Sequence, residues 1–235
     1  MLNASDMLFE PHFIEGIMKN TKLSGYTLFH GLSEEEISQA LRELRAQEKQ
    51  YGKDTLILSA GQTTERMGLV LKGSVTIESN DLWGNRTILS HVGEGGVFAE
   101  TYAWLCDEVV LVDVVANEEC RILFLTVANL RGPSLAREPW AAKLTANQLS
   151  ISAQKNLALA GRSFHTAPKS ARARIMAYLN TVSLQKQSRE FDIPFDRQQL
   201  ADYLNLERSA MSKELGRMRD EGLIRTQKNH FALLK

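Results

Sequence analysis

The chain has 235 residues, 43% of them hydrophobic, and its 28 Lys and Arg residues balance its 28 Asp and Glu residues. This is enough chain to bury a core in one or two domains. Two cysteines, Cys106 and Cys120, are too few for a four-thiolate iron–sulfur cluster. Without a signal peptide or an apolar run near 18 residues, we expect a cytoplasmic protein that does not associate with membranes and holds two buried thiols.

The charges are divided unevenly along the chain. From residue 168 onward there are 13 Lys and Arg residues against 8 Asp and Glu residues, whereas the first 167 residues hold 15 and 20. The basic C-terminal third is therefore where a polyanionic partner is expected to bind.

Residues 1–25 show no clear periodicity and are expected to form an arm or a short helix. The first strong helix signal is Ser33 followed by Glu36, a pair that forms a capping box at a helix N-terminus. Ile37, Leu41 and Leu44 then lie on one face of the following helix.

Between residues 49 and 125 the pattern changes to short apolar runs separated by glycines. Many short strands with regular turn signals predict a sandwich or jelly roll, and residues 81–85 (DLWGN) predict a hairpin tip. The expected strands are 55–58, 68–71, 74–77, 87–89, 109–115 and 121–125.

A long helix is predicted from about residue 135 to residue 163. Leu144, Ile151 and Ala158 recur every seven residues, which is typical of a coiled-coil contact with the same helix of a second subunit. The alternative is a helix buried against the chain's own β-roll. Residues 166–168 (TAP) break the helix and predict a hinge between domains.

The C-terminal region predicts a helix over 170–184 and then two short helices around a tight turn. Asp196 and Gln199 form a second capping-box pair at the start of the first short helix. Its apolar stripe is Leu200 and Leu204, and the inner face of the second helix, which begins near Glu207, is formed by Met211, Leu215 and Met218.

The opposite face of this second helix is polar and basic. It carries Arg208, Ser209, Ser212 and Lys213, with Arg217 one turn later. Such a face suits insertion into a DNA major groove, where Arg and Lys donate to guanine. Residues 223–226 and 231–234 predict a hairpin, or wing. The alternative is an ordinary helical hairpin with a solvated charged face.

Four segments, which occur along the chain in the same order as in the family, make the chain resemble the Crp–Fnr family of bacterial transcription regulators. The segments are 71–75 (LKGSV), 93–100 (GEGGVFAE), 170–175 (SARARI) and 206–224. The resemblance, which covers residues 26–235, implies an α+β fold with an N-terminal double-stranded β-helix (jelly roll) and a C-terminal winged helix-turn-helix. The expected parts are an arm at 1–25, an effector-sensing roll at 26–134, a dimerisation helix at 135–166 and a DNA-binding domain at 167–235.

The resemblance also implies a homodimer that binds double-stranded DNA at a near-palindromic operator. The family's base-reading positions fall on Arg208, Ser209 and Lys213, and Ser212 is a phosphate or base contact. Many members have Glu where this chain has Ser209, so their operators are not carried over. RNA polymerase is a candidate further partner, and the protein is not expected to be an enzyme.

For members that bind cyclic nucleotides, the resemblance places a Glu on the ribose and an Arg on the cyclic phosphate. This chain keeps Glu100 but has residues 109–112 (VVLV) where the Arg belongs, so cyclic AMP is not expected. The expectation is another small effector in a pocket formed by Gly95, Gly96, Val97, Phe98, Glu100, Val110 and Leu111. Alternatively, Glu100 caps a short helix at 101–105.

Other sensory chemistries have weaker support. Haem would need ligands from among His91, His30, His12 and Cys106, but these residues show no paired spacing. A thiol switch at Cys106 or Cys120 would need a basic neighbour to lower the pKa of the thiol, and the sequence shows none beyond Arg121. A cyclic-nucleotide-binding regulator that uses Glu100 and a cupin-like metalloenzyme remain as alternatives. Between residues 49 and 125, however, only His91 could serve a cupin metal site as an imidazole ligand.

Overall fold

The computed structural model describes residues 16–17, 21–80, 86–135 and 137–234, and for Arg86 it describes the backbone alone. The chain divides into two compact units, Met1–Ala153 and Gln154–Lys235, and each is described by itself. Most of the predicted N-terminal arm, the predicted hairpin tip at 81–85 and Ala136 lie outside the described residues.

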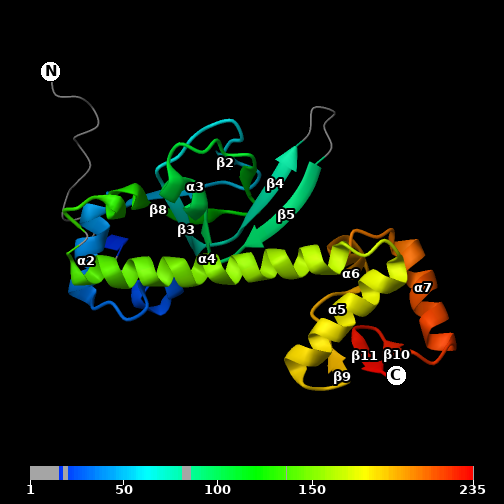
Figure 1. Cartoon of the computed structure of the whole chain (residues 1–235). Coiled ribbons are helices and arrows are strands. Elements are labelled where there is room, and N and C mark those ends of the chain that lie inside the picture. The colour runs from blue at the N-terminus through cyan, green and yellow to red at the C-terminus, as the bar shows by residue number, and fades with distance from the viewer. Residues whose placement is uncertain (1–15, 18–20, 81–85, 136, 235) are drawn as a thin grey trace. The chain divides into compact units, whose positions relative to one another are not determined.

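The first unit contains a β-roll built from two four-stranded antiparallel sheets (Figure 1). One sheet has the order β1-β8-β3-β6 and the other β2-β7-β4-β5. This confirms the predicted jelly roll. The strands are β1 Gln47–Tyr51, β2 Leu56–Leu58, β3 Met67–Lys72, β4 Val75–Asn80, β5 Arg86–Val92, β6 Val97–Phe98, β7 Asp113–Ala116 and β8 Cys120–Leu125.

Two short helices accompany the roll, α2 Glu34–Glu43 and α3 Glu100–Leu105. The predicted capping box at α2 is present, because Ser33 and Glu36 exchange side-chain and backbone hydrogen bonds. The 3-10 helices η1 Leu23–Gly25, η2 Thr27–Phe29 and η3 Val127–Arg131 complete the unit. The apolar stripe of α2 is fully buried, as its spacing predicted.

One predicted strand is shorter than expected. Residues 109–112 lie outside β7, and only Asp113–Ala116 pairs in the sheet. The amide of Val110 donates to the carbonyl of Gln62, and that of Gly61 donates to the carbonyl of Val110, both over 2.8 Å. The backbone there pairs with a loop, and Leu111 is 71% exposed. Apolar composition alone did not distinguish this segment from a buried strand.

The long helix α4 spans Pro139–Thr166, so it begins later than predicted and ends at the predicted break. Leu144 and Ile151 are buried in the core of the first unit, whereas Ala158 is exposed. For Leu144 and Ile151 the structure therefore supports the alternative prediction, in which this face of the helix packs on its own chain. The division between the compact units falls inside α4, after Ala153.

The second unit contains α5 Ala171–Lys186, α6 Arg197–Tyr203 and α7 Arg208–Asp220, together with a small antiparallel sheet of order β10-β11-β9. The hairpin strands are β10 Ile224–Gln227 and β11 His230–Leu233, and β9 Glu190–Asp192 adds an edge that the sequence analysis did not predict. The buried side chains include Met211, Leu215 and Met218, as the helix-turn-helix pattern predicted.

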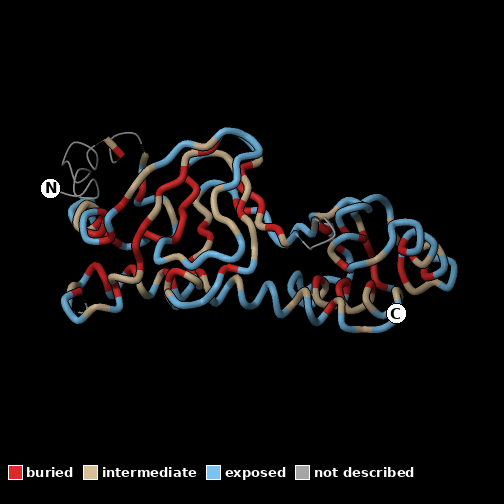
Figure 2. Tube along the Cα trace, turned by 90° about the horizontal axis from the view of Figure 1, so that it is seen from above, coloured by how far each residue is buried: buried red, intermediate tan, exposed pale blue. Residues whose placement is uncertain are grey.

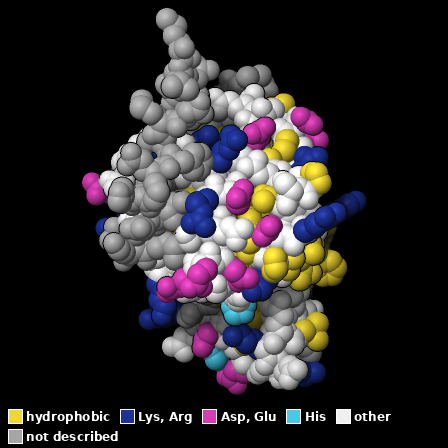
Figure 3. All heavy atoms as spheres, turned by 90° about the vertical axis from the view of Figure 1, so that its left-hand side faces the viewer, with side chains coloured by type: hydrophobic (Ala, Val, Ile, Leu, Met, Phe, Trp, Pro, Cys, Tyr) yellow, Lys and Arg dark blue, Asp and Glu magenta, His cyan; other side chains and the backbone are white. Residues whose placement is uncertain are grey.

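Buried residues are concentrated inside each unit (Figure 2). On the face drawn in Figure 3, acidic and basic side chains are both present and intermixed, and hydrophobic side chains also reach the surface. In the part of the chain that is described, every helix is too short or too polar to cross a membrane.

Candidate nucleic-acid interface

Helix α7 separates an apolar face from a basic one. Met211, Leu215 and Met218 are buried, with exposed fractions of 3% or less. The predicted outer residues Arg208, Ser209, Ser212, Lys213 and Arg217 are all exposed. Among the described residues, the side chains of Arg208, Ser209, Ser212 and Lys213 have no hydrogen-bond or ion-pair partner, so their donors are available to another molecule.

One arginine of α5 pairs with Glu214 of α7 and with Glu221, the residue that follows this helix. Nε of Arg172 lies 2.6 Å from Oε1 of Glu214, and its two terminal nitrogens each lie 2.7 Å from the carboxylate of Glu221. The carboxylates of Glu221 and Glu214 raise the pKa of Arg172, which stays charged. Because these ion pairs neutralise the two carboxylates, positive charge prevails on the outer face.

A second arginine of α5 fixes the turn of the helix-turn-helix. Nη1 of Arg174 donates to the carbonyls of Leu204 and Asn205 over 3.3 and 2.8 Å, and its Nε donates to the carbonyl of Pro168. Asn205 has a φ of 53°, a left-handed conformation that Asn tolerates better than most residues. The guanidinium thus satisfies carbonyls that the end of α6 leaves without a helical partner.

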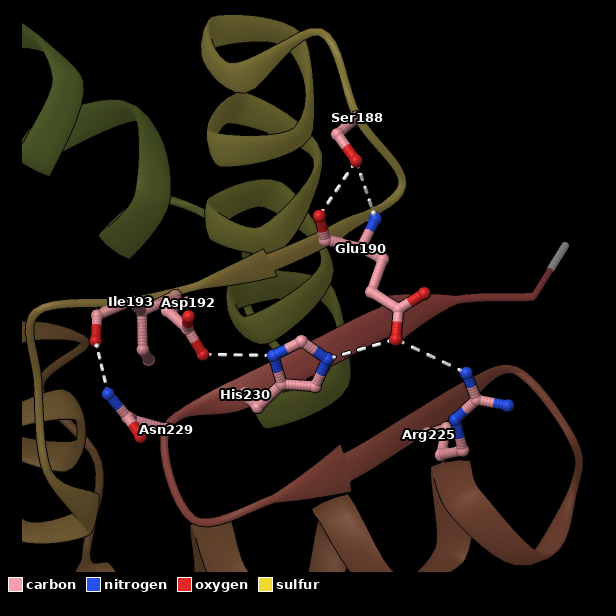
Figure 4. Close-up of polar contacts among 7 residues, drawn as sticks. All are labelled: Ser188, Glu190, Asp192, Ile193, Arg225, Asn229 and His230. Carbon is pink, nitrogen blue, oxygen red and sulfur yellow. Dashed lines mark hydrogen bonds and ion pairs between the residues drawn. The ribbon is translucent and has the colours of Figure 1, made fainter.

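The wing is joined to β9 by a cluster of charges around one imidazole (Figure 4). Nδ1 of His230 lies 2.9 Å from Oδ1 of Asp192, and its Nε2 lies 3.0 Å from Oε1 of Glu190. Arg225 on β10 also approaches Glu190, at 3.4 Å. Hydrogen bonds to Glu190 and Asp192 raise the pKa of His230, while those from His230 and Arg225 lower the pKa of Glu190.

A hollow of about 790 Å³ lies beside the N-terminal ends of α6 and α7 and the turn of the wing. Three of its lining residues are basic, Arg197, Arg208 and Lys228, and one is acidic, Asp196. Nη2 of Arg197 donates to Thr226, but Nη1 is buried and unpartnered within the described part of the chain. Burial lowers the pKa of Arg197. Neither Arg197 nor Lys228 was among the predicted DNA contacts, because Arg197 lies at the start of α6 and Lys228 in the turn of the wing, both outside the outer face of α7.

The predicted effector pocket is largely filled by the protein itself. Val97, Phe98 and Val110 are buried in the core, with exposed fractions of 1% or less. The amide of Gly95 donates to Val70 and that of Gly96 to Gly93, so both are already used. Gly95 has a φ of 77°, and a Cβ there would lie 3.0 Å from the Tyr26 ring, whereas one at Gly96 would lie 2.6 Å from Val92; backbone conformation and close packing thus explain these glycines.

Glu100 is buried, with 6% of its surface exposed, at the first position of α3. The N-cap of this helix is Ala99, which adopts a left-handed φ of 58°, so the N-cap position itself is not occupied by Glu100. Leu111 is exposed instead of facing a pocket, although its amide lies 3.4 Å from the hydroxyl of Tyr102 on α3.

Cys106 has a basic neighbour that the sequence did not reveal. Nη1 of Arg131 lies 3.3 Å from its sulfur, because η3 packs against α3. Cys120 is buried, and burial raises the pKa of its thiol. Within the described ranges, His, Cys, Asp and Glu residues form no group of three that could hold a metal ion.

Two family models match the sequence, one in each unit. The model described as a cyclic nucleotide-binding domain matches residues 48–132, and the model described as a Crp-like helix-turn-helix domain matches residues 173–235. Among curated proteins, none is similar enough in sequence to count as a relative.

Several solved structures are similar to this chain, and the first two described here share its fold. The c-di-GMP responsive global regulator CLP of Xanthomonas campestris is 17% identical with a TM-score of 0.55, and the match covers 86% of this chain and 100% of that one. OCPA-complexed CprK is 15% identical with a TM-score of 0.56 over 83% and 89% of the two chains. The catabolite activator protein of Thermus thermophilus is 26% identical with a TM-score of 0.48 over 88% and 93%.

Proposed function

The chain belongs to the Crp–Fnr family of DNA-binding transcription regulators, and we propose that it binds a near-palindromic operator as a homodimer. One observation supports this proposal above all others. The exposed donors of Arg208, Ser209, Ser212 and Lys213 lie together on α7, while Glu214 and Glu221 are paired with Arg172. Since the proposed partner of this protein is chromosomal DNA, we expect the protein to be cytoplasmic.

In this proposal α7 enters the major groove and the wing lies along the backbone. Arg208 and Lys213 read bases, with Ser209 as a less selective reader, and Ser212 and Arg217 contact phosphates or base edges. The basic hollow lined by Arg197 and Lys228 supports an additional phosphate contact beside the wing.

The second subunit would pack along an exposed apolar stripe of α4. The stripe consists of residues spaced three or four apart, all of them exposed: Ala142, Ala146, Leu149, Ala153, Leu157, Ala160 and Phe164. Leu149, Leu157 and Phe164 are 67–75% exposed, which is a large apolar surface to leave in water. This stripe replaces the seam that the sequence predicted at Leu144, Ile151 and Ala158.

We further propose that any effector of the β-roll is a small molecule other than a cyclic nucleotide. Residues 109–112 stand where the resemblance places the family's phosphate-binding Arg, and Val110 among them is fully buried, while the amides of Gly95 and Gly96 already have acceptors. A buried phosphate at these positions would lack the cation and the donors that compensate its desolvation. Calorimetric titration with cyclic AMP is expected to give no binding heat, and haem and metal analyses of the purified protein are expected to be negative.

The test of DNA recognition is selection of binding sites from random duplex DNA, followed by affinity measurements over a salt series. Replacement of Arg208 or Lys213 by Ala is expected to cost about 1–3 kcal/mol and to relax specificity at one base pair of each half-site. Lys228→Ala is expected to weaken binding to all sequences and to reduce the salt slope by about 1.

The matched control is Lys53→Ala, which removes an exposed positive charge from the first unit. It is expected to leave the operator affinity unchanged. If both α7 variants retain full discrimination between operator and random DNA, the assignment of α7 as the reading helix is wrong. Contact with RNA polymerase is a separate proposal, testable by transcription from the selected site.

A further inference from the structure

The second unit contains a hollow that DNA recognition does not use. It has a volume of about 610 Å³ and lies between the last turns of α4, the second half of α5 and the segment that precedes α6. Its lining residues all come from the second unit. This volume lies within the range of about 300–1,000 Å³ that small-molecule pockets occupy.

One wall of the hollow is aromatic. The rings of Phe195 and Tyr203 lie 4.9 Å apart with an interplanar angle of 31°, and the Tyr178 ring lies 5.4 Å from that of Tyr203. Ile193, which is buried, adds an aliphatic surface beside them. Flat rings grouped in this way suit contact with the ring of an aromatic ligand.

A glycine keeps the α4 side of the hollow open. Gly161 lies in the interior of α4, where Gly is less favourable than Ala by about 0.5–1 kcal/mol. A Cβ added at Gly161 would meet no atom within 4 Å. Neither close packing nor the helical backbone requires glycine at this position, but a larger side chain would enter the hollow.

The rim of the hollow carries one positive and one negative side chain. Two charged residues line it, Lys186 and Asp192. The Asp192 carboxylate is engaged by Nδ1 of His230 at 2.9 Å. The Lys186 ammonium, at the end of α5, has no hydrogen-bond or ion-pair partner in the described part of the second unit. An acidic ligand group would therefore be attracted to the Lys186 side of the rim.

Three helices meet at an imidazole that lines the same hollow. His165 of α4 is 4% exposed; its Nδ1 lies 3.0 Å from the hydroxyl of Tyr203 on α6, and its Nε2 lies 2.9 Å from the hydroxyl of Thr181 on α5. A ligand in contact with Gly161, Tyr178 and Tyr203 would thus touch all three helices where they join.

We propose that this hollow binds a small aromatic carboxylate, with its ring against Phe195 and Tyr203 and its carboxylate facing Lys186. The site is separate from the β-roll, and binding there does not depend on the proposed DNA recognition. Its regulatory consequence does rest on that proposed function: a ligand that favours one packing of α4 against α6 shifts the affinity for the operator.

The test uses 2-naphthoate as the probe and isothermal titration calorimetry of the full chain. The variant Gly161→Leu adds a bulky side chain to the wall of the hollow and is compatible with the helix, because an added Cβ meets no atom within 4 Å and Leu favours the helical conformation. Lys186→Gln removes the rim charge. The matched controls are Gly216→Leu, at a helical glycine of α7 that also faces open space, and Lys169→Gln, at an exposed lysine outside the hollow.

The wild-type protein is expected to bind 2-naphthoate more tightly than the neutral 2-naphthamide. Gly161→Leu is expected to lower the affinity by at least about tenfold, and Lys186→Gln by about two- to fivefold, since the charge is solvent-exposed. Both controls are expected to bind as the wild type does. Circular dichroism of Gly161→Leu establishes that the loss is not caused by unfolding.

Three outcomes would overturn the proposal. The first is that the wild-type protein does not bind 2-naphthoate, and the second is that Gly161→Leu binds it as tightly as the wild type does. The third is that only a variant with a disrupted dimer binds it, which would mean that a second copy of the chain covers the hollow. None of these readouts involves DNA, so a failure of this site is distinguishable from a failure of operator recognition.

Discussion

At the residue scale, two histidines of the second unit show how surroundings set a charge. His165 is buried between hydroxyl groups, and burial lowers its pKa, so the neutral imidazole is favoured. His230 lies between two carboxylates at the surface, and its pKa is raised from the ordinary value of 6.5. The first residue therefore links three helices through hydroxyl partners, whereas the second links β11 to β9 through two carboxylates that favour its protonated form.

The charge cluster of the wing predicts a pH dependence. Because the folded-state pKa of His230 is raised, its contribution to stability is complete below about pH 6.5 and is lost as the pH rises through the raised pKa. Because the pKa of Glu190 is lowered, its contribution is complete above about pH 4.3 and is lost as the pH falls through the lowered pKa. The wing is expected to be most firmly held between these two limits.

Nuclear magnetic resonance titration of the His230 ring checks this prediction. The pKa of His230 is expected to fall toward 6.5 when Glu190 and Asp192 are replaced by Gln and Asn. The replacement Glu138→Gln, in the first unit, provides a matched control and should not move it. An unshifted pKa in the wild-type protein would mean that the two carboxylates do not hold the imidazolium in solution.

At the element scale, α6 depends on its N-terminal cap. The amide of Gln199 donates to Oδ1 of Asp196 over 2.8 Å, and the amide of Asp196 donates to Oε1 of Gln199 over 2.9 Å. α6 has only seven residues, so these bonds satisfy a large share of its unpaired backbone groups. The first helix of the reading motif is thereby fixed at its start by Asp196 and at its end by Arg174.

Loss of this cap has a defined expected cost. Asp196→Ala is expected to lower the free energy of unfolding by about 1 kcal/mol, because the amide of Gln199 loses its acceptor. Hydrogen exchange of the α6 amides and urea denaturation measure the effect. Asp196→Asn keeps an acceptor oxygen and is expected to cost much less; equal losses in both variants would mean that the charge, and not the cap, is responsible.

At the scale of the whole molecule, the exposed stripe of α4 predicts the assembly. Leu149→Arg places a charge on the stripe, where a dimer would have to bury it, so the protein is expected to sediment as a monomer and to lose operator affinity. Leu184→Arg is the matched control, because Leu184 is 79% exposed on α5 and lies outside the stripe. A Leu149→Arg variant that remains dimeric would place the subunit contact elsewhere.

Much of the architecture follows from local sequence patterns. Both capping boxes, the apolar faces of α2 and α7, the break after Thr166 and six of the eight strands of the roll follow from spacing rules that act over a few residues, whereas β1 and β6 were not predicted. Local sequence constrains such features because the partners lie three or four residues apart. The family resemblance, which the two family models confirm, rests on the same segments.

Other features depend on which element packs against which. The sequence did not show that Leu144 and Ile151 belong to the chain's own core, since a seven-residue repeat is the same whichever surface covers it. It also did not show that residues 109–112 leave the sheet, or that Arg131 lies beside Cys106. The roles of Arg208, Ser209, Ser212, Lys213 and Arg217 in DNA binding remain predictions.

The sequence by itself determined the fold class, the order of the elements and the basic outer face of α7. Only the tertiary structure decided which charges are neutralised, which apolar faces stay exposed and where a hollow remains. Arg172 pairs with residues 42 and 49 positions away, and Gly161 opens onto side chains from α5 and α6. Contacts over such distances depend on packing geometry, which local periodicity does not encode.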